Sequence, residues 1–387
     1  MNEIQFLLES YDALKSDAKR AALATVVKVR GSAYRRPGAR MLIAPDGRTV
    51  GSFSAGCLDR DVCERAQKVI SSGAPQVAIY DTTAAGDDVW GLGIGCAGLV
   101  EILIEPLGQG ATASHVLAFL GERLARRDPG VVVTVFRGLG APTANVGSRL
   151  MLTGVGQAFC TVEDPRLALV LADEARQALQ EGRSRVKESG VQGGTVEAFI
   201  EVVWPPVPLV IFGAGDDAVP LARLAKEIGW RVTVVDSRSG YATSERFPSA
   251  DTIVVGRPES ASQRVQVDER TVAVVMTHNY AHDMELLKML LLSPVRYLGI
   301  LGARNRTAAM LRALHEKEPG LLEHELERVY SPIGLDIGAE TPEEIALAIL
   351  AEIKAVTTGR PARFLRDRKA PIHDVIDAGG SPVSLMD

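Results

Sequence analysis

Along the second half of the chain, short apolar runs alternate with stretches in which apolar residues recur every three or four positions. The runs predict buried strands, and they lie at residues 209–212, 231–236, 252–255, 271–277 and 296–301. The helical spacing predicts helices, and it lies at residues 218–228, 280–292, 304–317 and from 341 onward. Such alternation is typical of a parallel sheet covered by helices on both faces. We therefore predict an α/β fold whose C-terminal part, residues 208–359, is a Rossmann-type doubly wound parallel sheet domain.

The last of these helices carries its own start signal. Thr341 is followed by Pro342, and Glu344 stands three positions after the threonine. Proline is favoured at the first helical position, and a Thr–Glu pair at this spacing forms a capping box. The sequence therefore predicts that this helix begins directly after Thr341.

The first half of the chain has a mixed pattern that occurs twice. Its first part predicts a helix, a strand, a loop, a hairpin, a second helix and two further strands, at residues 3–16, 21–30, 31–38, 41–53, 58–71, 77–80 and 99–104. Several segments are echoed later in the same order: 25–31 in 134–138, 37–42 in 146–151, 64–67 in 174–177 and 100–105 in 196–201. Ordered echoes of this kind indicate an internal duplication. We predict an N-terminal α+β region made of a first copy, residues 1–106, and a second, degenerate copy, residues 107–204.

A proline-rich segment separates the two halves. Residues 204–208 read Trp-Pro-Pro-Val-Pro, and each proline fixes its own φ and restricts the residue before it. Such a segment is a stiff linker, so we place the domain boundary there. Residues 360–387 then form a C-terminal tail.

The composition narrows the classes of partner. Hydrophobic residues make up 46% of the chain and charged residues 24%, as is typical of soluble globular proteins. The formal net charge is -5 without a basic block, so we expect neither nucleic acid nor an anionic membrane surface as a partner. No secretory signal pattern opens the sequence, and no apolar run reaches the ~18 residues of a transmembrane helix. The 4 scattered cysteines do not suggest a disulfide scaffold, which predicts reduced thiols and a cytoplasmic location.

A glycine-rich turn joins the first predicted strand of the C-terminal domain to its helix. The turn has the pattern G-x-G-x-x-A, with Gly213, Gly215 and Ala218, and the next predicted strand ends in Asp236. In a strand–turn–helix–strand setting, this pattern is typical of dinucleotide binding, because the glycines permit a tight turn and a close approach of the ligand. The acid is placed to accept hydrogen bonds from a ribose diol. Gly213, Gly215 and Asp236 are therefore candidate cofactor-binding residues, with NAD(P) as a candidate ligand.

Two acidic residues within the turn do not fit this assignment. Asp216 and Asp217 stand where the helix N-terminus would offer N–H groups to a phosphate. Carboxylates suit the helix dipole at this position, but they repel a pyrophosphate. The alternative is that both acids cap the helix and that the domain binds no dinucleotide.

Two cysteines of the first copy stand in settings that favour thiol chemistry. Cys57 directly precedes a predicted helix, a position that lowers a thiol pKa and favours the thiolate. Cys96 lies in a glycine-rich insert, residues 90–98, that the second copy lacks. Both are candidate ligand-binding residues that could converge on one ligand; the alternatives are a small buried thiol for Cys57 and a turn residue for Cys96. They form no C-x-x-C motif, so we expect no metal site, and we expect Cys63 and Cys160 to be structural.

Arginines of the first copy flank a Pro–Gly turn. Arg35 and Arg36 have no counterpart in the second copy and could clamp an oxyanion or a phosphate. Arg40 has a counterpart, Arg149, so we expect Arg40 to belong to the structural framework. The alternative for Arg35 and Arg36 is that they are solvated loop charges.

Further candidates follow two predicted strands of the C-terminal domain. His278 and His282 stand four residues apart, directly after the strand at 271–277. Doubly wound folds bind ligands at the carboxyl ends of their strands, so we expect ligand contact here. The spacing could also hold a metal, although no third ligand is evident, and the remaining alternative is a helix cap with polar neighbours. Arg304 follows the next strand and could close the same crevice over an anion.

Together these residues resemble the xanthine dehydrogenase accessory factor family, XdhC/CoxI. In the N-terminal half the resemblance rests on Gly31-Ser32, Arg36-Pro37-Gly38, Gly51, Gly56-Cys57-Leu58-Asp59 and the Cys96-Ala97-Gly98 loop with the strand after it. In the C-terminal half it rests on Phe212-Gly213-Ala214-Gly215, Val234 to Arg238, Arg246-Phe247-Pro248, Met276-Thr277-His278, Leu298-Gly299 and Pro332 to Leu335. The chain departs from the family pattern at Ala97, which replaces a glycine, and at Asp216, where many members have a histidine. No cofactor role is therefore carried over to Asp216.

The resemblance implies a maturation factor for molybdenum hydroxylases of the xanthine dehydrogenase type. Such proteins bind the molybdenum cofactor as cargo, in its molybdopterin form or extended by a nucleotide. They protect its sulfurated form and help to insert it into the apo-enzyme, so the chain would be a cofactor-binding chaperone rather than a catalyst. The implied partner is a molybdenum hydroxylase apo-enzyme, and further candidates are a cysteine desulfurase and a second copy of the chain in a homodimer.

Two other functions stay open on the sequence. The Rossmann-type motif favours an NAD(P)-dependent oxidoreductase, against which stand Asp216, Asp217 and the lack of an acid–base constellation. The other is a protein-interaction adaptor, in which Cys57 and Cys96 would have no role.

Overall fold

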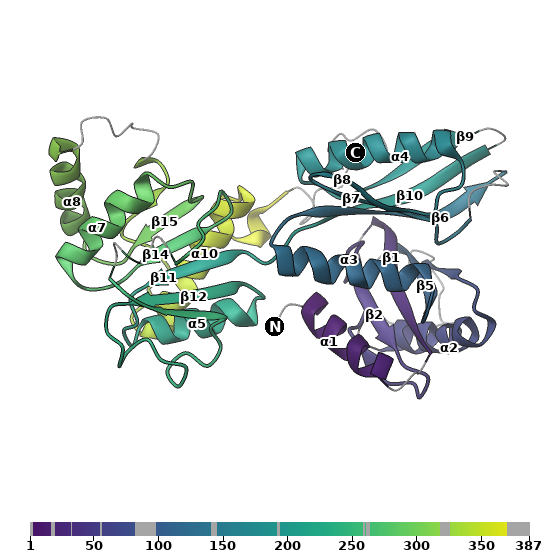
Figure 1. Cartoon of the computed structure of the whole chain (residues 1–387), viewed down its shortest axis with the longest axis horizontal. Coiled ribbons are helices and arrows are strands. Elements are labelled where there is room, and N and C mark those ends of the chain that lie inside the picture. Colours follow the sequence, from purple (N-terminus) through teal and green to yellow (C-terminus); the bar gives the residue numbers. More distant parts are fainter. Residues whose placement is uncertain are drawn as a thin grey trace. The chain divides into compact units, whose positions relative to one another are not determined.

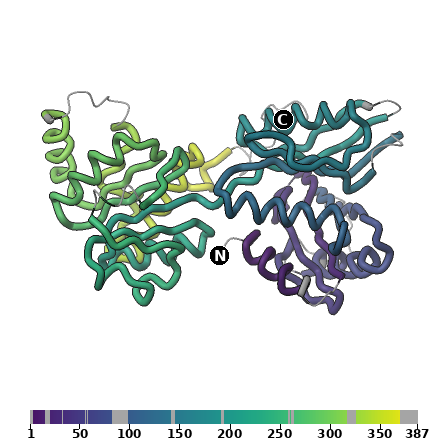
Figure 2. The backbone as a smooth tube through the Cα atoms, viewed as in Figure 1, coloured from purple at the N-terminus to yellow at the C-terminus, as the bar shows by residue number. Residues whose placement is uncertain are grey.

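The computed structural model describes residues 3–16, 20–31, 33–54, 56–81, 98–140, 145–191, 194–257, 260, 264–317 and 326–369. Contacts divide the described residues into two compact units, Glu3–Pro205 and Pro206–Lys369. The division falls between two prolines of the segment at 204–208. Figure 2 traces the backbone of each unit, coloured along the sequence. None of the described helices is long and apolar enough to cross a membrane.

The first unit contains two sheets built to the same plan. Its first copy consists of α1 (Glu3–Ser16), β1 (Ala21–Gly31), β2 (Arg40–Ile43), β3 (Thr49–Val50), α2 (Cys57–Ser72), β4 (Gln76–Asp81) and β5 (Gly98–Leu107). Its second copy consists of α3 (Thr112–Arg126), β6 (Gly130–Leu139), β7 (Arg149–Thr153), β8 (Gly156–Cys160), α4 (Pro165–Glu181), β9 (Arg185–Val191) and β10 (Gly194–Val203). The strand orders are β3-β2-β1-β5-β4 and β8-β7-β6-β10-β9. The repeated order confirms the predicted internal duplication.

Apolar side chains from both copies meet inside the first unit. Val27 and Leu103 of the first copy form a buried cluster with Phe136 and Phe199 of the second. Helices α2 and α4 cover their own sheets, whereas α1 and α3 contribute to a core that both copies share. Because the shared core is apolar and buried, the two copies form one folded body.

Two ion pairs cross between the copies in a symmetric arrangement. Arg40 of β2 donates to Glu201 of β10, with Nη1 at 2.9 Å from Oε1. Arg149 of β7 pairs with Glu105 of β5 in the reverse direction. Each arginine also donates to a glycine carbonyl of its own turn, at 2.9 Å in both copies. The crossed pairs confirm that Arg40 belongs to the framework.

The second unit is a six-stranded parallel sheet with helices on both faces (Figure 1). Its elements are β11 (Pro208–Phe212), α5 (Ala218–Glu227), β12 (Arg231–Asp236), β13 (Thr252–Val255), β14 (Val272–Val275), α7 (Tyr280–Leu291), β15 (Tyr297–Ile300), α8 (Arg304–Lys317), β16 (Val329–Tyr330), α10 (Pro342–Thr358) and the 3-10 turn η1 (Leu365–Asp367). The order is β13-β12-β11-β14-β15-β16. Helices α5 and α10 pack on one face, and α7 and α8 on the other. This arrangement confirms the predicted doubly wound Rossmann-type fold.

Two details differ from the predicted elements. Strand β14 ends at Val275, two residues earlier than predicted, since the chain leaves the extended conformation before His278, whose φ is +58°. Met276 N–H still donates to the carbonyl of Phe212 at 2.8 Å. Strand β16 was not predicted, since it has only two residues and both are half-buried. Strands β11 and β14 are parallel neighbours. After β11 the chain continues to β12 on one side, and after β14 it continues to β15 on the other side. A crevice opens between the two connections, at the carboxyl ends of the strands.

Candidate functional site

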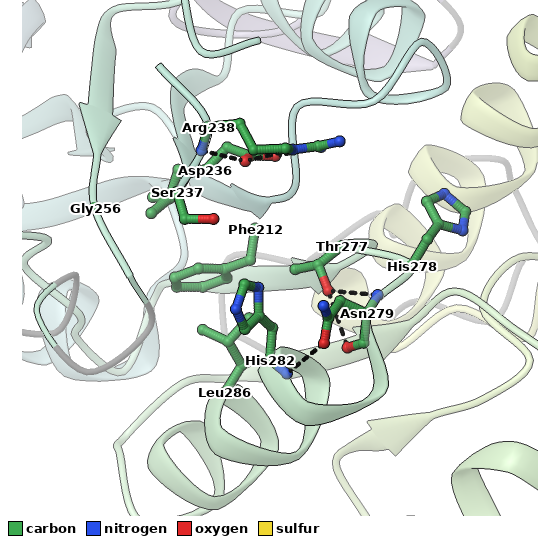
Figure 3. Close-up of a pocket in the computed structure, with 11 residues that line it drawn as sticks. Phe212, Asp236, Ser237, Arg238, Gly256, Thr277, His278, Asn279, His282 and Leu286 are labelled. Atoms are coloured by element: carbon green, nitrogen blue, oxygen red, sulfur yellow. Dashed lines mark hydrogen bonds and ion pairs between the residues drawn. The ribbon is translucent and has the colours of Figure 1, made fainter. Parts of the chain in front are cut away.

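A cavity of about 380 Å³ opens at the carboxyl ends of the strands where the strand order reverses. Its lining comes from β11, the ends of β12, β13 and β14, and the first turns of α7: Phe212, Val235, Asp236, Ser237, Arg238, Gly256, Thr277, His278, Asn279, His282 and Leu286. Figure 3 shows Ser237 and Arg238 on one side and Thr277, Asn279 and His282 on the other. The volume lies in the range of about 300–1,000 Å³ that is usual for small-molecule sites.

The glycine-rich turn lies against the end of β14 in a conformation that requires glycine. Gly213 has a φ of +121°, and a Cβ atom there would lie 2.3 Å from the carbonyl oxygen of Met276. A side chain at this position would therefore push the turn away from the sheet. The next residue, Ala214, donates its N–H to Asp236 Oδ2 at 2.7 Å, which ties the turn to the end of β12.

Both oxygens of Asp236 have partners inside the protein. Oδ1 accepts from the backbone N–H and the Nε of Arg238 at 2.8 and 3.0 Å, and Oδ2 accepts from Arg238 Nη2 at 2.7 Å. Burial on its own would raise the pKa of Asp236, but the hydrogen bonds from Arg238 and from Ala214 N–H hold it below its usual value. The ionised carboxylate thus organises the turn and the arginine. We expected it to bind a ribose diol, which would have to compete for these oxygens.

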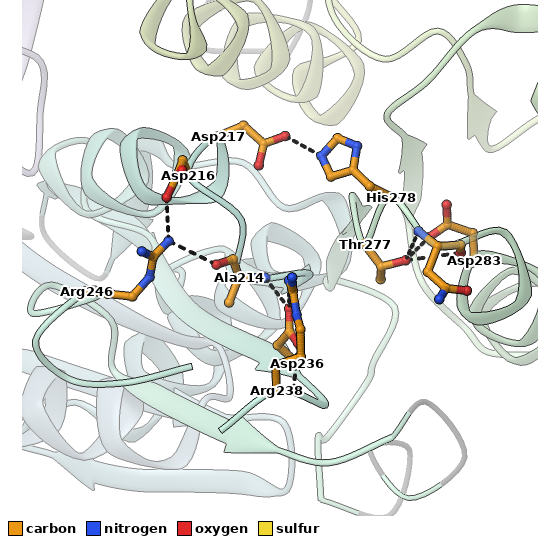
Figure 4. Close-up of polar contacts among 10 residues, drawn as sticks. Ala214, Asp216, Asp217, Asp236, Arg238, Arg246, Thr277, His278 and Asp283 are labelled. Carbon is orange, nitrogen blue, oxygen red and sulfur yellow. Dashed lines mark hydrogen bonds and ion pairs between the residues drawn. The ribbon is translucent and has the colours of Figure 1, made fainter. Parts of the chain in front are cut away.

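The two acids of the turn bind basic side chains instead of capping α5. Asp216 Oδ1 lies 2.8 Å from Arg246 Nη2, and Asp217 Oδ2 lies 2.8 Å from His278 Nε2 (Figure 4). Asp217 occupies the N-cap position but makes no side-chain hydrogen bond to the helix. The alternative that both acids cap α5 is therefore wrong for Asp217. Two carboxylates stand at the helix end where a dinucleotide fold holds its pyrophosphate.

His278 has a strained backbone as well as an acidic partner. Its φ is +58°, a left-handed conformation that disfavours a residue with a Cβ by roughly 1–2 kcal/mol. Its ring turns toward Asp217, whereas the ring of His282 lies beside Phe212 and Leu286 (Figures 3 and 4). Among the described residues, no three His, Cys, Asp or Glu side chains converge to hold a metal. The two histidines therefore face different surroundings despite their four-residue spacing.

Arg238 and Asn279 are among the lining residues that we had not singled out. Arg238 follows the strand-ending acid by two positions, and its Cζ atom lies over the ring of Tyr241, 3.9 Å from the ring centre. Asn279 accepts the N–H of His282 at 3.1 Å and thereby caps α7. An N-cap amide directly before a helical pattern was the available signal for Asn279. The role of Arg238 depends on its contact with Tyr241, which the sequence pattern did not indicate.

The other predicted site residues lie apart from this cavity or outside the described residues. Arg304 is exposed at the first position of α8 and does not line the cavity. In the other unit, Arg35 pairs with Glu3, while Arg36 is half-buried and burial lowers its pKa. Cys57 is the first residue of α2, but its side chain is outside the described part of the structure. Cys96 and residues 90–97 of its insert lie outside the described residues altogether.

Comparisons with known proteins identify relatives over both units. The family model "XdhC Rossmann domain" matches residues 209–353, and the model "XdhC and CoxI family" matches residues 14–81 and 123–190. A Bacillus subtilis protein, named as a probable subunit of xanthine dehydrogenase, is 34% identical over 342 residues, which cover 88% of this chain and 94% of the relative. The Escherichia coli "Molybdenum cofactor insertion chaperone PaoD" is 25% identical over 345 residues, 89% of this chain and 86% of the relative.

A solved structure has the same fold. The crystal structure of a xanthine dehydrogenase from Bacillus halodurans aligns with a TM-score of 0.72 at 28% identity. The alignment covers 95% of this chain and 98% of that chain. The likeness therefore extends over both units.

Proposed function

The chain belongs to the XdhC and CoxI family, and from this premise we propose that it carries the molybdenum cofactor to a xanthine-dehydrogenase-type molybdenum hydroxylase. In this proposal the chain binds the cofactor as cargo, assists its sulfuration and hands it to the apo-enzyme. The names of two relatives support it, since one is called a probable part of xanthine dehydrogenase and the other a molybdenum cofactor insertion chaperone. Each relative aligns with more than four-fifths of this chain, as the coverages of 88% and 89% indicate.

The observation that carries the proposal is the cavity at the switch point of the Rossmann-type unit. Its lining includes the apolar side chains of Phe212 and Leu286 and the polar side chains of Arg238 and His282. Molybdopterin carries a pterin ring system, a phosphate and a dithiolene, and in the cofactor the dithiolene holds the molybdenum. A lining that offers both apolar contact and hydrogen-bonding groups suits a ring system with polar edges. Arg238 and His282 are the side chains that we expect to contact the cargo.

The same geometry argues against the oxidoreductase alternative. Asp216 and Asp217 place negative charge at the N-terminus of α5, where NAD(P) would bring its diphosphate. The acid that would bind the adenosine ribose, Asp236, already has a full set of donors. We therefore do not assign NAD(P) as a cofactor of this chain.

For sulfur handling we retain the residues of the first copy as proposals. A thiolate at the start of a helix is stabilised by the helix dipole, so Cys57 is the candidate to receive or protect sulfur. Cys96 is the second candidate thiol, and Arg35 and Arg36 are candidates to bind an anionic group of the cargo. Arg304, Gly213 and Gly215 are not among the residues that line the cavity, and we retain them as candidates for contacts with the cargo beyond it. A cysteine desulfurase would supply the sulfur, and a homodimer is the proposed assembly.

The first test asks whether the full chain carries cargo. The protein would be purified from a host that makes the molybdenum cofactor, and bound pterin would be oxidised to its fluorescent form and quantified. We expect near-stoichiometric pterin, and transfer of the cargo should activate an apo molybdenum hydroxylase. The same protein from a host that lacks the cofactor pathway is the control. A chain that carries no pterin from the competent host, and takes up none when it is added, would refute the proposal.

The thiols are tested by substitution with matched controls. Cys57→Ser and Cys96→Ser should lower activation of the apo-enzyme at least tenfold, while pterin content changes less. Cys63→Ser is the control from the same helix: burial, with the nearby Asp59 charge, raises the pKa of its thiol, so it stays protonated. Equal activation by all three variants would leave the chaperone role intact but remove the thiols from it.

A further inference from the structure

We propose that the switch-point cavity is a subsite for a flat heteroaromatic ring, which stacks on the guanidinium of Arg238 and directs its phosphate-bearing end away from the glycine-rich turn. This inference rests on the proposed function, because it identifies the part of the cargo that the cavity receives. It also reverses the usual Rossmann arrangement, in which the phosphates lie on the turn. The ring can be the pyrimidine part of the pterin or the base of a nucleotide extension, since both have a flat π-face.

Arg238 is held in one orientation by three separate contacts. Its Nε and Nη2 donate to Asp236 at 3.0 and 2.7 Å, and its Cζ atom lies over the Tyr241 ring, 3.9 Å from the ring centre. Its backbone N–H also donates to Asp236 at 2.8 Å. An arginine fixed in this way loses little further conformational entropy when a ring stacks on it. The guanidinium is thus a rigid platform rather than a mobile surface charge.

One face of the platform is covered and the other is available. Tyr241 covers one face, and it does not line the cavity, whereas Arg238 does. The Arg238 side chain is 47% exposed although it is bound to a carboxylate that is only 5% exposed. The open face of the guanidinium therefore borders the cavity. Guanidinium planes and aromatic rings are the surfaces on which proteins stack heterocyclic bases.

The remaining walls suit a ring with polar edges. Phe212, Val235 and Leu286 offer apolar contact. Around them stand the Ser237 hydroxyl and the imidazole of His282, groups that hydrogen-bond to ring nitrogens and exocyclic groups (Figure 3). Apolar contact with the faces of a ring, together with hydrogen bonds to its edge, fixes the orientation of a small aromatic ligand.

The turn next to the cavity disfavours a phosphate. The Asp216 side chain is 90% exposed at the mouth of the turn, where it pairs with Arg246. Arg246 also lies 5.1 Å from the Tyr241 ring, so the acid and the platform belong to one connected set of contacts. On the other side of the turn, Asp217 is bound by His278. Like charges brought together at a binding site weaken binding and exclude the wrong ligand. A ligand whose ring fills the cavity is therefore expected to point its phosphate elsewhere.

The test uses free rings as probes, so that it does not depend on cargo delivery. Binding of 6-hydroxymethylpterin, cytidine and ADP-ribose to the full chain would be measured by fluorescence and by calorimetry. We expect one of the two free rings to bind, and the preference between them identifies the source of the ring. Arg238→Lys keeps the charge but loses the plane, and it should weaken ring binding about tenfold. Arg366→Lys, at an exposed arginine 4.9 Å from Phe364 and outside the cavity, is the matched control.

Two further variants separate stacking from folding and from charge. Tyr241→Leu removes the support of the guanidinium and should weaken ring binding without removing any charge. The double variant Asp216→Asn/Asp217→Asn should strengthen ADP-ribose binding at least tenfold by removing two negative charges. Circular dichroism and thermal unfolding would establish that each variant is folded.

The outcomes distinguish this inference from the proposed function. Ring binding that is unchanged in Arg238→Lys, or wild-type protein that binds ADP-ribose but neither free ring, would overturn the subsite. If rings bind in the expected way but the protein carries no molybdenum cofactor from a competent host, the subsite stands and the proposed function fails. If the protein delivers cargo yet Arg238→Lys binds rings and cargo normally, the function stands and the subsite is wrong.

Discussion

At the scale of single residues, Asp236 connects three parts of the site. Its carboxylate binds the N–H of Ala214 in the turn and both the backbone and the side chain of Arg238. Because charge-assisted hydrogen bonds are stronger than neutral ones, one buried acid can hold the turn and the arginine in fixed positions. The motif singled out this acid for a ligand, whereas in the structure its oxygens accept hydrogen bonds from Ala214 and Arg238.

The pKa of Asp236 leads to a prediction for acid stability. Its pKa is lower in the folded than in the unfolded state, so its contribution to stability is full above about pH 4 and is lost as the pH falls through the folded value. Asp236→Asn should therefore destabilise the protein by about 1–3 kcal/mol at pH 7 and by progressively less below about pH 4. Urea unfolding across this pH range measures the difference. Asp336→Asn, at an exposed carboxylate, is the control, and a constant deficit at every pH would contradict the prediction.

At the scale of elements, the helix starts show where the two copies diverged. Helix α4 of the second copy has an ordinary N-cap, because the Asp164 side chain accepts N–H groups of the first turn. Helix α2 of the first copy starts after Gly56 without a side-chain cap. Its Asp59 instead accepts the N–H groups of Phe53 and Ser54 and so holds the loop that leads to Cys57. A helix start without a side-chain cap is a position at which the helix dipole can stabilise an anion or a thiolate.

Helix α10 provides a test of a start signal that the sequence predicted. Its capping box is formed: the Thr341 side chain accepts Glu344 N–H, and Glu344 accepts Thr341 N–H at 3.0 Å. Thr341→Ala should lower the free energy of unfolding by about 1 kcal/mol, whereas Thr341→Ser should retain most of it. Denaturant unfolding of the three proteins gives the comparison. An alanine variant as stable as the wild type would show that packing of α10, and not its cap, determines where the helix begins.

At the scale of the whole molecule, the duplication joins the N-terminal sheets through charges as well as through apolar contacts. Arg149 and Glu105 are both only 3% exposed, and the Arg40–Glu201 pair is its counterpart in the opposite sense. Burying such a pair gains little by itself, but leaving one member without its partner is costly. The crossed pairs therefore specify how the two copies face each other.

Substituting Arg149 alone, or Arg149 and Glu105 together, separates the cost of an unpaired buried charge from the small gain of the buried pair itself. Arg149→Met should destabilise the protein by about 3–5 kcal/mol because it leaves Glu105 buried without a counter-charge. The double variant Arg149→Met/Glu105→Leu should recover most of that loss, because both charges are replaced by apolar groups. Arg48→Met, at an exposed pair with Asp46, should change stability by less than about 1 kcal/mol. A double variant that is no more stable than the single one would contradict this account.

The sequence by itself determined the elements, the duplication and the location of the glycine-rich turn. These features depend on local patterns: helical spacing marks α5 and α7, apolar runs mark the buried strands, and Thr341 with Glu344 marks the start of α10. Asp236 and His278 were predicted from their positions at strand ends and do line the cavity. The two-residue strand β16 left too short a pattern to be recognised.

Only the tertiary structure decided what these residues contact. Asp236 and Arg238 are close in the chain, but the Ala214 N–H and the Tyr241 ring that complete their contacts come from other segments. Asp217 meets His278 across 61 positions of the chain, and Arg40 meets Glu201 across 161. Such contacts depend on how the strands are ordered in the sheet and on the direction of each side chain, which local patterns do not specify. For that reason the position of the cavity could be predicted from the sequence, whereas the charge pairing around it could not.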